Sequence, residues 1–129
     1  MTAREAGPVA VFCADDNEAF RGLVRSLVTA TSGFVMVGEA ASAEEALILI
    51  TDTRPDLVLM DIRMPGMSGV RAAEILSKTQ PRLRVVLMSA NPAEAQAELG
   101  PLVPPVTVLD KAELSTRRLS ELRDGDATP

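Results

Sequence analysis

Three carboxylates stand directly after apolar segments in this 129-residue chain. Asp61 ends the run Asp56-Leu-Val-Leu-Met-Asp61, and the Pro65-Gly66 pair then predicts a loop. Asp15 and Asp16 follow another apolar run. A buried strand that ends on an acid places that acid at the edge where open α/β sheets bind their ligands. Three acids at one such edge would suit a divalent cation, Mg²⁺ or Mn²⁺, because both prefer oxygen ligands.

A hydroxyl and an ammonium stand at equivalent places later in the chain. Ser89 closes the apolar run 83–89, and Lys111 comes directly after the run 106–110. Parallel strands end on the same side of their sheet, so polar groups that follow different strands converge there. We therefore expect one pocket to contain Asp15, Asp16, Asp61, Ser89 and Lys111.

The elements that must position these residues are short apolar runs that alternate with segments of helical spacing. The runs are rich in Val, Leu, Met and Ile, and they predict strands at 8–14, 34–39, 56–61, 83–89 and 106–110. The first intervening segment has one apolar stripe, which should pack on the sheet and is formed by Phe20, Leu23, Val24, Leu27 and Val28. Further helix starts are predicted at Ser42, where Glu45 completes a capping box, at Ser68, and at Asn91-Pro92 with Glu94. The last helix is expected at about 112–123.

Strand and helix alternate five times, which predicts an α/β fold with a five-stranded parallel sheet covered by helices on both faces. Right-handed crossovers favour the doubly wound order 2-1-3-4-5. The switch point of that order lies between strands 1 and 3, the strands that deliver the three acids. The length fits one domain spanning 1–129, with a core at about 8–123 and a flexible tail at 124–129, the possible start of a linker to an absent output domain.

Composition excludes several classes of function. Thirteen Lys and Arg stand against 18 Asp and Glu, a net charge of −5, which argues against direct nucleic-acid binding. No apolar stretch is long enough to span a membrane and the start lacks a signal-peptide core, so we expect a cytoplasmic protein. The absence of His excludes histidine catalysis. The single cysteine, Cys13, is expected to be a buried structural thiol.

Four motifs in order carry a resemblance to a known family. They are the acidic pair 15–16, the segment Asp61-Ile-Arg-Met-Pro-Gly-Met-Ser-Gly69, the strand Val85-Val-Leu-Met-Ser89-Ala90 and Leu109-Asp-Lys111. Their spacings are also typical, because Asp61 lies 45 positions after Asp16, Ser89 lies 28 positions after Asp61, and Lys111 lies 22 positions after Ser89. Over residues 8–123 the chain resembles a response-regulator receiver domain, the phosphorylation module of two-component signalling.

The resemblance implies a role for each residue of the pocket. Asp61 would accept a phosphoryl group from a sensor histidine kinase and form an aspartyl phosphate. Lys111 would pair first with Asp61 and then with a phosphoryl oxygen, and Ser89 would turn its hydroxyl toward the phosphate. Homodimerisation through the face of strands 4 and 5, and a C-terminal DNA-binding output domain, are further implied partners. The implied ligands of Mg²⁺ or Mn²⁺ are Asp15, Asp16, Asp61 and the backbone carbonyl of Arg63.

Three departures from the family pattern favour an alternative. Val108 stands where receivers usually carry Tyr or Phe, a ring that moves between exposed and buried positions on phosphorylation. Ala112 replaces a common proline, so we expect a trans link with a shifted loop or a strained cis bond. The stretch 100–105 contains three prolines in place of small residues. The alternative is an atypical receiver that acts as a phosphorylation-independent docking or dimerisation module.

Simpler interpretations remain open for single residues. Asp15 with Glu18 spells a capping box, so Asp15 could serve only to cap a helix. The Ser89 hydroxyl could simply bind the backbone. A third function, a haloacid-dehalogenase-type phosphatase, also places a nucleophilic Asp after a strand. It requires a second acid two residues later as general acid, where this chain has Arg63.

Overall fold

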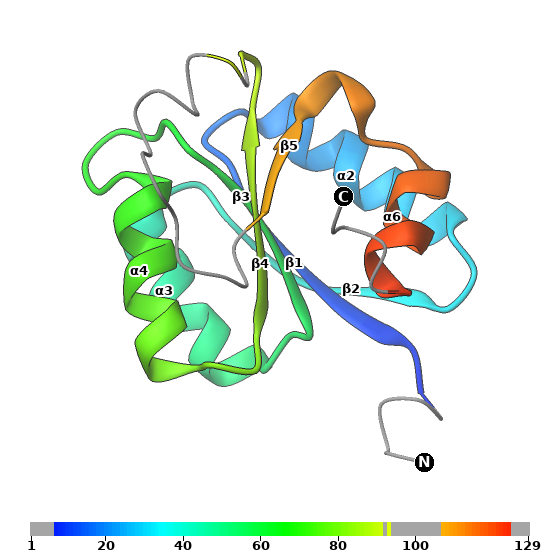
Figure 1. Cartoon of the computed structure of the whole chain (residues 1–129), viewed down its shortest axis with the longest axis horizontal. Helices are drawn as coiled ribbons and strands as arrows, with labels where there is room; N and C mark the ends of the chain where they lie inside the picture. Colours follow the sequence, from blue (N-terminus) through cyan, green and yellow to red (C-terminus); the bar gives the residue numbers. More distant parts are fainter. Residues whose placement is uncertain (1–6, 92, 94–106, 125–129) are drawn as a thin grey trace.

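A five-stranded parallel sheet forms the centre of the molecule (Figure 1). The computed structural model describes residues 7–91, 93 and 107–124. Its strands are β1 (Val9–Ala14), β2 (Phe34–Ala40), β3 (Leu57–Asp61), β4 (Arg84–Ser89) and β5 (Thr107–Asp110), in the order β2-β1-β3-β4-β5. The predicted fold class and strand order are confirmed. The bounds predicted for the first four strands agree to within one residue.

Helices cover both faces of the sheet, as Figure 1 shows. On one face α3 (Ala43–Thr53) and α4 (Gly69–Thr79) pack against apolar side chains that include Phe12. On the other, α2 (Glu18–Ala30) and α6 (Thr116–Arg123) pack against the alternate side chains of the same strands, which include Val11 and Cys13. Burial on both faces explains why the strands read as nearly continuous apolar runs.

Serine side chains begin two helices as predicted. The Ser42 hydroxyl accepts a hydrogen bond from the backbone N–H of Glu45 at 3.1 Å, and the Ser68 hydroxyl accepts one from that of Arg71, also at 3.1 Å. The Glu45 carboxylate accepts from the backbone of Ala41 at 3.0 Å, one residue earlier than in a standard capping box. These caps fix the starts of α3 and α4, whose first turns lie near the loops that follow β2 and β3.

The predicted apolar stripe of α2 is wrong at one position. Val24 and Val28 are fully buried and Phe20 and Leu27 are partly buried, but Leu23 is 49% exposed. Successive residues of an α-helix are separated by about 100° around its axis. The buried face is centred on Val24 and Val28, which leaves Leu23 at its margin.

The end of the chain forms two short elements where one helix was predicted at 112–123. Lys111–Glu113 is a single 3-10 turn, and α6 begins only at Thr116. Between them Leu114 is extended and buried. Ser115 caps α6 by accepting from the N–H of Arg118 at 3.0 Å, a capping signal that the sequence contained and that marks the true start.

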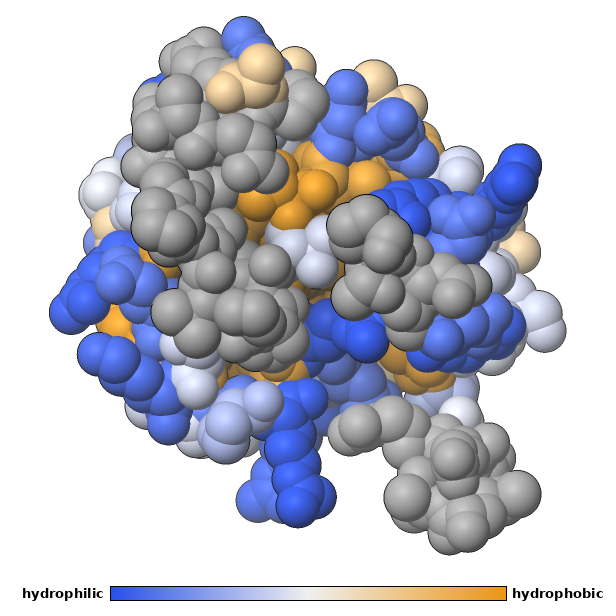
Figure 2. All heavy atoms as spheres, viewed as in Figure 1, coloured by the Kyte–Doolittle hydropathy of each residue, from blue (hydrophilic) through white to orange (hydrophobic). Residues whose placement is uncertain are grey.

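Three expectations concern segments outside the described residues. They are most of the helix predicted to start at Asn91-Pro92, the proline-rich stretch 100–105, and the tail beyond Asp124. Among the helices within 7–91 and 107–124, none is long and apolar enough to cross a membrane. In the view of Figure 2, hydrophilic residues cover much of the outer sides, and hydrophobic residues reach the surface near β4 and β5.

Candidate functional site

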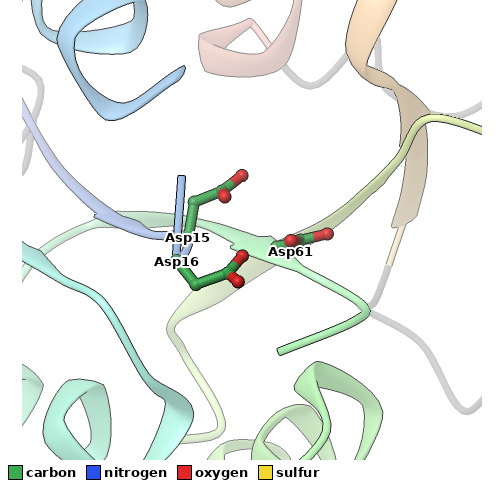
Figure 3. A group of neighbouring side chains, drawn as sticks. All are labelled: Asp15, Asp16 and Asp61. Atoms are coloured by element: carbon green, nitrogen blue, oxygen red, sulfur yellow. The ribbon is translucent and has the colours of Figure 1, made fainter. Parts of the chain in front are cut away.

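The three acids predicted to meet do meet. One carboxylate oxygen each from Asp15, Asp16 and Asp61 lies within 4.8 Å of the others, and Figure 3 shows their side chains at the ends of β1 and β3. The two strands are parallel neighbours, with Ala14 opposite Met60, so the residues after β1 come beside the last residue of β3. Asp15 is fully buried, Asp61 is 8% exposed and Asp16 is exposed. The cluster therefore has a buried side and a side open to solvent.

Asp15 is fixed through both its backbone and its side chain. Its N–H donates to the carbonyl of Ala40 at 3.0 Å, and its own carbonyl accepts from the Arg21 guanidinium at 2.7 Å. The carboxylate oxygen Oδ1 accepts from the backbone N–H of Asn17 at 2.9 Å. Asn17, whose side chain accepts from the N–H of Phe20 at 3.0 Å, is the N-cap of α2. The interpretation of Asp15 as the helix cap is therefore wrong, because Asn17 already holds that position.

Lys111 brings a positive charge to the cluster from the end of β5. Its Nζ lies 2.6 Å from Oδ2 of Asp15 and 3.5 Å from Oδ2 of Asp61. The expected pairing with Asp61 is present, yet the contact with Asp15 is the shorter. Asp15 is removed from water entirely, whereas Asp61 keeps some contact with solvent. An unpaired carboxylate would therefore cost more free energy at Asp15 than at Asp61.

Burial and neighbouring charges shift the pKa values of Asp61 and Lys111. Burial raises the pKa of Asp61, the nearby charge of Asp15 raises it further, and the positive charge of Lys111 opposes both. Burial alone would lower the pKa of Lys111. The hydrogen bond to Asp15 and the negative charges of Asp61 and Asp15 outweigh that effect and leave the Lys111 pKa raised, so the ammonium stays charged at neutral pH.

The loop between β3 and α4 is tied back to the cluster. The backbone N–H of Arg63 donates to Oδ1 of Asp61 at 3.4 Å, and that of Gly69 donates to the carbonyl of Ile62 at 2.9 Å. From α3, the Glu44 carboxylate accepts from the N–H of Met67 at 3.2 Å. Sequence reasoning missed Glu44, because an acid in the first turn of a helix usually needs no partner other than the helix dipole.

Gly69 gives a test of how tightly this loop is packed. A Cβ at this position would lie 2.0 Å from the backbone oxygen of Asp61, a clash that only a backbone shift relieves. We expect Gly69→Ala to destabilise the fold by about 2 to 3 kcal/mol, although Gly→Ala in a helix normally stabilises by up to about 1 kcal/mol. Urea unfolding measures the change.

Gly22→Ala is the matched control, because a Cβ at Gly22 in α2 would meet only the end of the Arg25 side chain, at 4.0 Å. This variant should be as stable as the native protein or more so. Equal stability of Gly69→Ala and Gly22→Ala would show that the Asp61 loop yields easily.

Ser89 is the last residue of β4, next to the strand that ends in Asp61, and Val108 lies on β5 opposite Leu87. The Ser89 hydroxyl accepts from the backbone N–H of Asn91 at 2.9 Å, which matches the simpler interpretation of this residue in the present conformation. Val108 is partly buried against the apolar cluster on the α3 and α4 side. Ala112 lies in the 3-10 turn, where its N–H donates to the Asp110 carboxylate at 2.9 Å. The roles in phosphate binding and switching assigned to Ser89 and Val108 stay predictions.

The donor set fits a hard divalent cation. It consists of carboxylate oxygens from Asp15, Asp16 and Asp61, with solvent access on the Asp16 side for waters. The Cys13 thiol is unsuited to bind a metal, because burial, and next the charges of Asp15 and Glu39, raise its pKa to about 12. Cys13 is thus the buried packing residue that the sequence predicts.

Comparison with known proteins gives one consistent family. The family model of the response regulator receiver domain matches residues 11–104. Response regulator GacA of Pseudomonas aeruginosa is 33% identical over 81 residues, 63% of this chain and 38% of GacA. VraR of Staphylococcus saprophyticus is 35% identical over 83 residues, 64% of this chain and 40% of VraR. A protein-glutamate methylesterase/protein-glutamine glutaminase of Anaeromyxobacter dehalogenans is 38% identical over 91 residues, 68% of this chain but 26% of that protein. The chain thus matches well under half the length of each relative.

Solved structures agree in fold. The signal receiver domain of the response regulator NarL from Mycobacterium tuberculosis superposes with a TM-score of 0.75 at 30% identity, over 94% of this chain and 97% of that one. A chain of the CheX–CheY complex of Borrelia burgdorferi gives a TM-score of 0.80 over 100% of this chain and 96% of that one, at 23% identity. The segment matched by the family model, 11–104, contains most of β1 and all of β3 and β4, with all three acids and Ser89. The chain belongs to the response regulator receiver domain family.

Proposed function

We propose that this protein is the phosphoacceptor of a cytoplasmic two-component system, taking a phosphoryl group from a sensor histidine kinase onto Asp61. The observation that carries the proposal is the position of Asp61 within the cluster. Its carboxylate has two other acids close by and the Lys111 ammonium at 3.5 Å. An acid that served only in a turn would need none of these neighbours.

In the proposed transfer, a carboxylate oxygen of Asp61 forms a bond to phosphorus. The bond between phosphorus and the donor breaks, and its electron pair leaves with the donor. Lys111 offsets the charge on the phosphoryl oxygens. A divalent cation held by Asp15, Asp16, Asp61 and the carbonyl of Arg63 would add to that charge stabilisation when bound.

Hydrolysis of the aspartyl phosphate returns Asp61 to its starting state. The chemistry we propose is therefore the cycle of one side chain, without turnover of a further substrate. A switch at Ser89 and at the face of β4 and β5 would carry the signal to a second copy of the chain or to a DNA-binding output domain. The receiver itself, with a net charge of −5, would not contact DNA.

Intact-mass spectrometry tests the proposal. With Mg²⁺ and a small phosphodonor such as acetyl phosphate, the protein should gain the mass of one phosphoryl group, and chelation of the cation should prevent the gain. As a control, Asp52→Asn, which changes an exposed carboxylate of α3 to an amide, should gain the phosphoryl group as the native protein does. No added mass from a folded protein under these conditions would refute the assignment.

A second candidate function is supported by Val108. This side chain is already packed against the apolar cluster and is too short to exchange between two distant positions. The chain would then accept phosphate, or bind a partner, without the usual change of its β4 and β5 face. Light scattering with and without a fluoroberyllate mimic separates the two functions, because only a coupled switch changes oligomer mass or partner affinity.

A further inference from the structure

The Lys111 ammonium is bordered by an aromatic ring as well as by acids. Its Nζ lies 4.5 Å from the centroid of the Phe20 ring on α2, while Asp15 and Asp61 lie at 2.6 and 3.5 Å. The negative face of an aromatic ring attracts a cation at this distance. The ring and the two carboxylates therefore restrict the ammonium together.

Phe20 is itself held in place by the first turn of α2. Its N–H donates to the Asn17 side chain at 3.0 Å, and the backbone of Asn17 donates to Asp15. Its neighbour Arg21 donates to the Asp15 carbonyl at 2.7 Å and pairs with Glu39 at 3.4 Å. The start of this helix is thus connected to the acidic cluster at two points, and the ring is a fixed boundary for a lysine that has a long, flexible stem.

We propose that Phe20 is a positioning residue for phosphoryl transfer, which keeps the Lys111 ammonium where a phosphoryl group on Asp61 would meet it. The inference rests on the function proposed above. The contact that the Phe20 ring makes with the site is with the Lys111 ammonium, so we assign its effect to the lysine. Without the ring, the stem could turn the ammonium toward exposed Asp16 or water.

Nuclear magnetic resonance of the lysine side chains reads the position of Lys111 directly. The chain has only two lysines, and the second, Lys78, is exposed at the end of α4. The ring current of Phe20 should move the ε-methylene signals of Lys111 upfield of those of Lys78. Phe20→Leu should remove that displacement, and Phe20→Tyr, which keeps the ring, should retain it.

The phosphorylation rate with acetyl phosphate and Mg²⁺ provides the functional readout. We expect Phe20→Leu to react about threefold to tenfold more slowly, the range of a partly exposed cation–ring contact, and Phe20→Tyr to react at close to the native rate. Phe34→Leu is the matched control. The Phe34 ring contacts the Arg123 guanidinium at 5.5 Å, away from the acids, so its loss should change stability but neither the rate nor the Lys111 signals.

The outcomes separate the inference from the proposed function. If the native protein is phosphorylated and Phe20→Leu reacts equally fast, or if Phe20→Tyr is as slow as Phe20→Leu, the positioning role is refuted and the proposed function stands. If the folded native protein takes no phosphoryl group, both are refuted. A slow Phe20→Leu with displaced Lys111 signals, together with an unaffected Phe34→Leu, supports the inference.

Discussion

Asp61→Asn is expected to abolish phosphorylation completely, because the amide oxygen is not a nucleophile toward phosphorus and no neighbouring acid replaces it. Asp15 is buried and bound by Lys111 and Asn17, and Asp16 follows β1, whereas Asp61 ends β3. Mass spectrometry after incubation with acetyl phosphate and Mg²⁺ measures the result. Phosphorylation of Asp61→Asn at the native rate would mean that another residue is the acceptor.

The same substitution should stabilise the fold at neutral pH, on the order of 1 kcal/mol. Burial and the charge of Asp15 raise the pKa of Asp61, so the folded protein holds the Asp61 proton more tightly than the unfolded chain does. Stability linked to that proton is present at low pH and is lost as pH rises through the raised pKa. Above it, native Asp61 is ionised at a cost that Asn does not incur.

Unfolding by urea across pH checks the sign. The advantage of Asp61→Asn should be largest at neutral pH without divalent cation. It should shrink as pH falls through the raised pKa of Asp61 toward the ordinary range. Added Mg²⁺ should also reduce it, because the cation offsets the repulsion among the carboxylates. A variant that is less stable than the native protein at pH 7 would contradict this account of the cluster.

Lys111→Met should lower both the stability of the fold and the rate of phosphorylation by large amounts. Without the ammonium, the fully buried Asp15 carboxylate lies next to Asp61 and loses its ion pair, while Arg21 contacts only the backbone carbonyl of Asp15. Removing one partner of a buried ion pair costs about 3 kcal/mol or more. Phosphorylation should slow by about 10² to 10³-fold, the range seen when a group that stabilises transition-state charge is removed.

Two matched variants separate charge from shape in that experiment. Lys111→Arg keeps the charge, so it should recover most of the stability but little of the rate, since a planar guanidinium does not replace a compact ammonium. Lys78→Met, at an exposed position, should change neither by much. If Lys111→Met unfolds at neutral pH, Mg²⁺, or mild acid acting through the raised pKa of Asp61, should restore the fold by reducing the negative charge of the cluster. A fold that neither condition stabilises would contradict the role of Lys111 as counterion.

The fold and the core of the site were predictable because they depend on patterns of short range. Uninterrupted apolar runs mark doubly buried strands, and acids at the ends of such runs meet wherever the strands are parallel neighbours. Asp15, Asp16 and Asp61 therefore follow from the strand order alone. Lys111 followed from its place after β5, although its closer partner proved to be Asp15.

What the sequence did not predict depends on competition between similar local signals. Asp15 and Asn17 are both good capping residues, and the choice of Asn17 leaves Asp15 free to bind Lys111. Ser115 competes with the helical pattern around 112 and breaks the last helix in two. The contact between Phe20 and Lys111 joins residues distant in sequence, and neither type signals a pocket by itself.

The ion pair between Lys111 and Asp15 spans 96 residues of chain. It joins the first strand of the sheet to the fifth, so the site gains its ammonium only when β5 is in place at the sheet edge. A folding intermediate in which only β1 to β4 are paired would hold all three carboxylates of the site without that ammonium. We therefore expect such an incompletely folded chain to react only slowly with a phosphodonor.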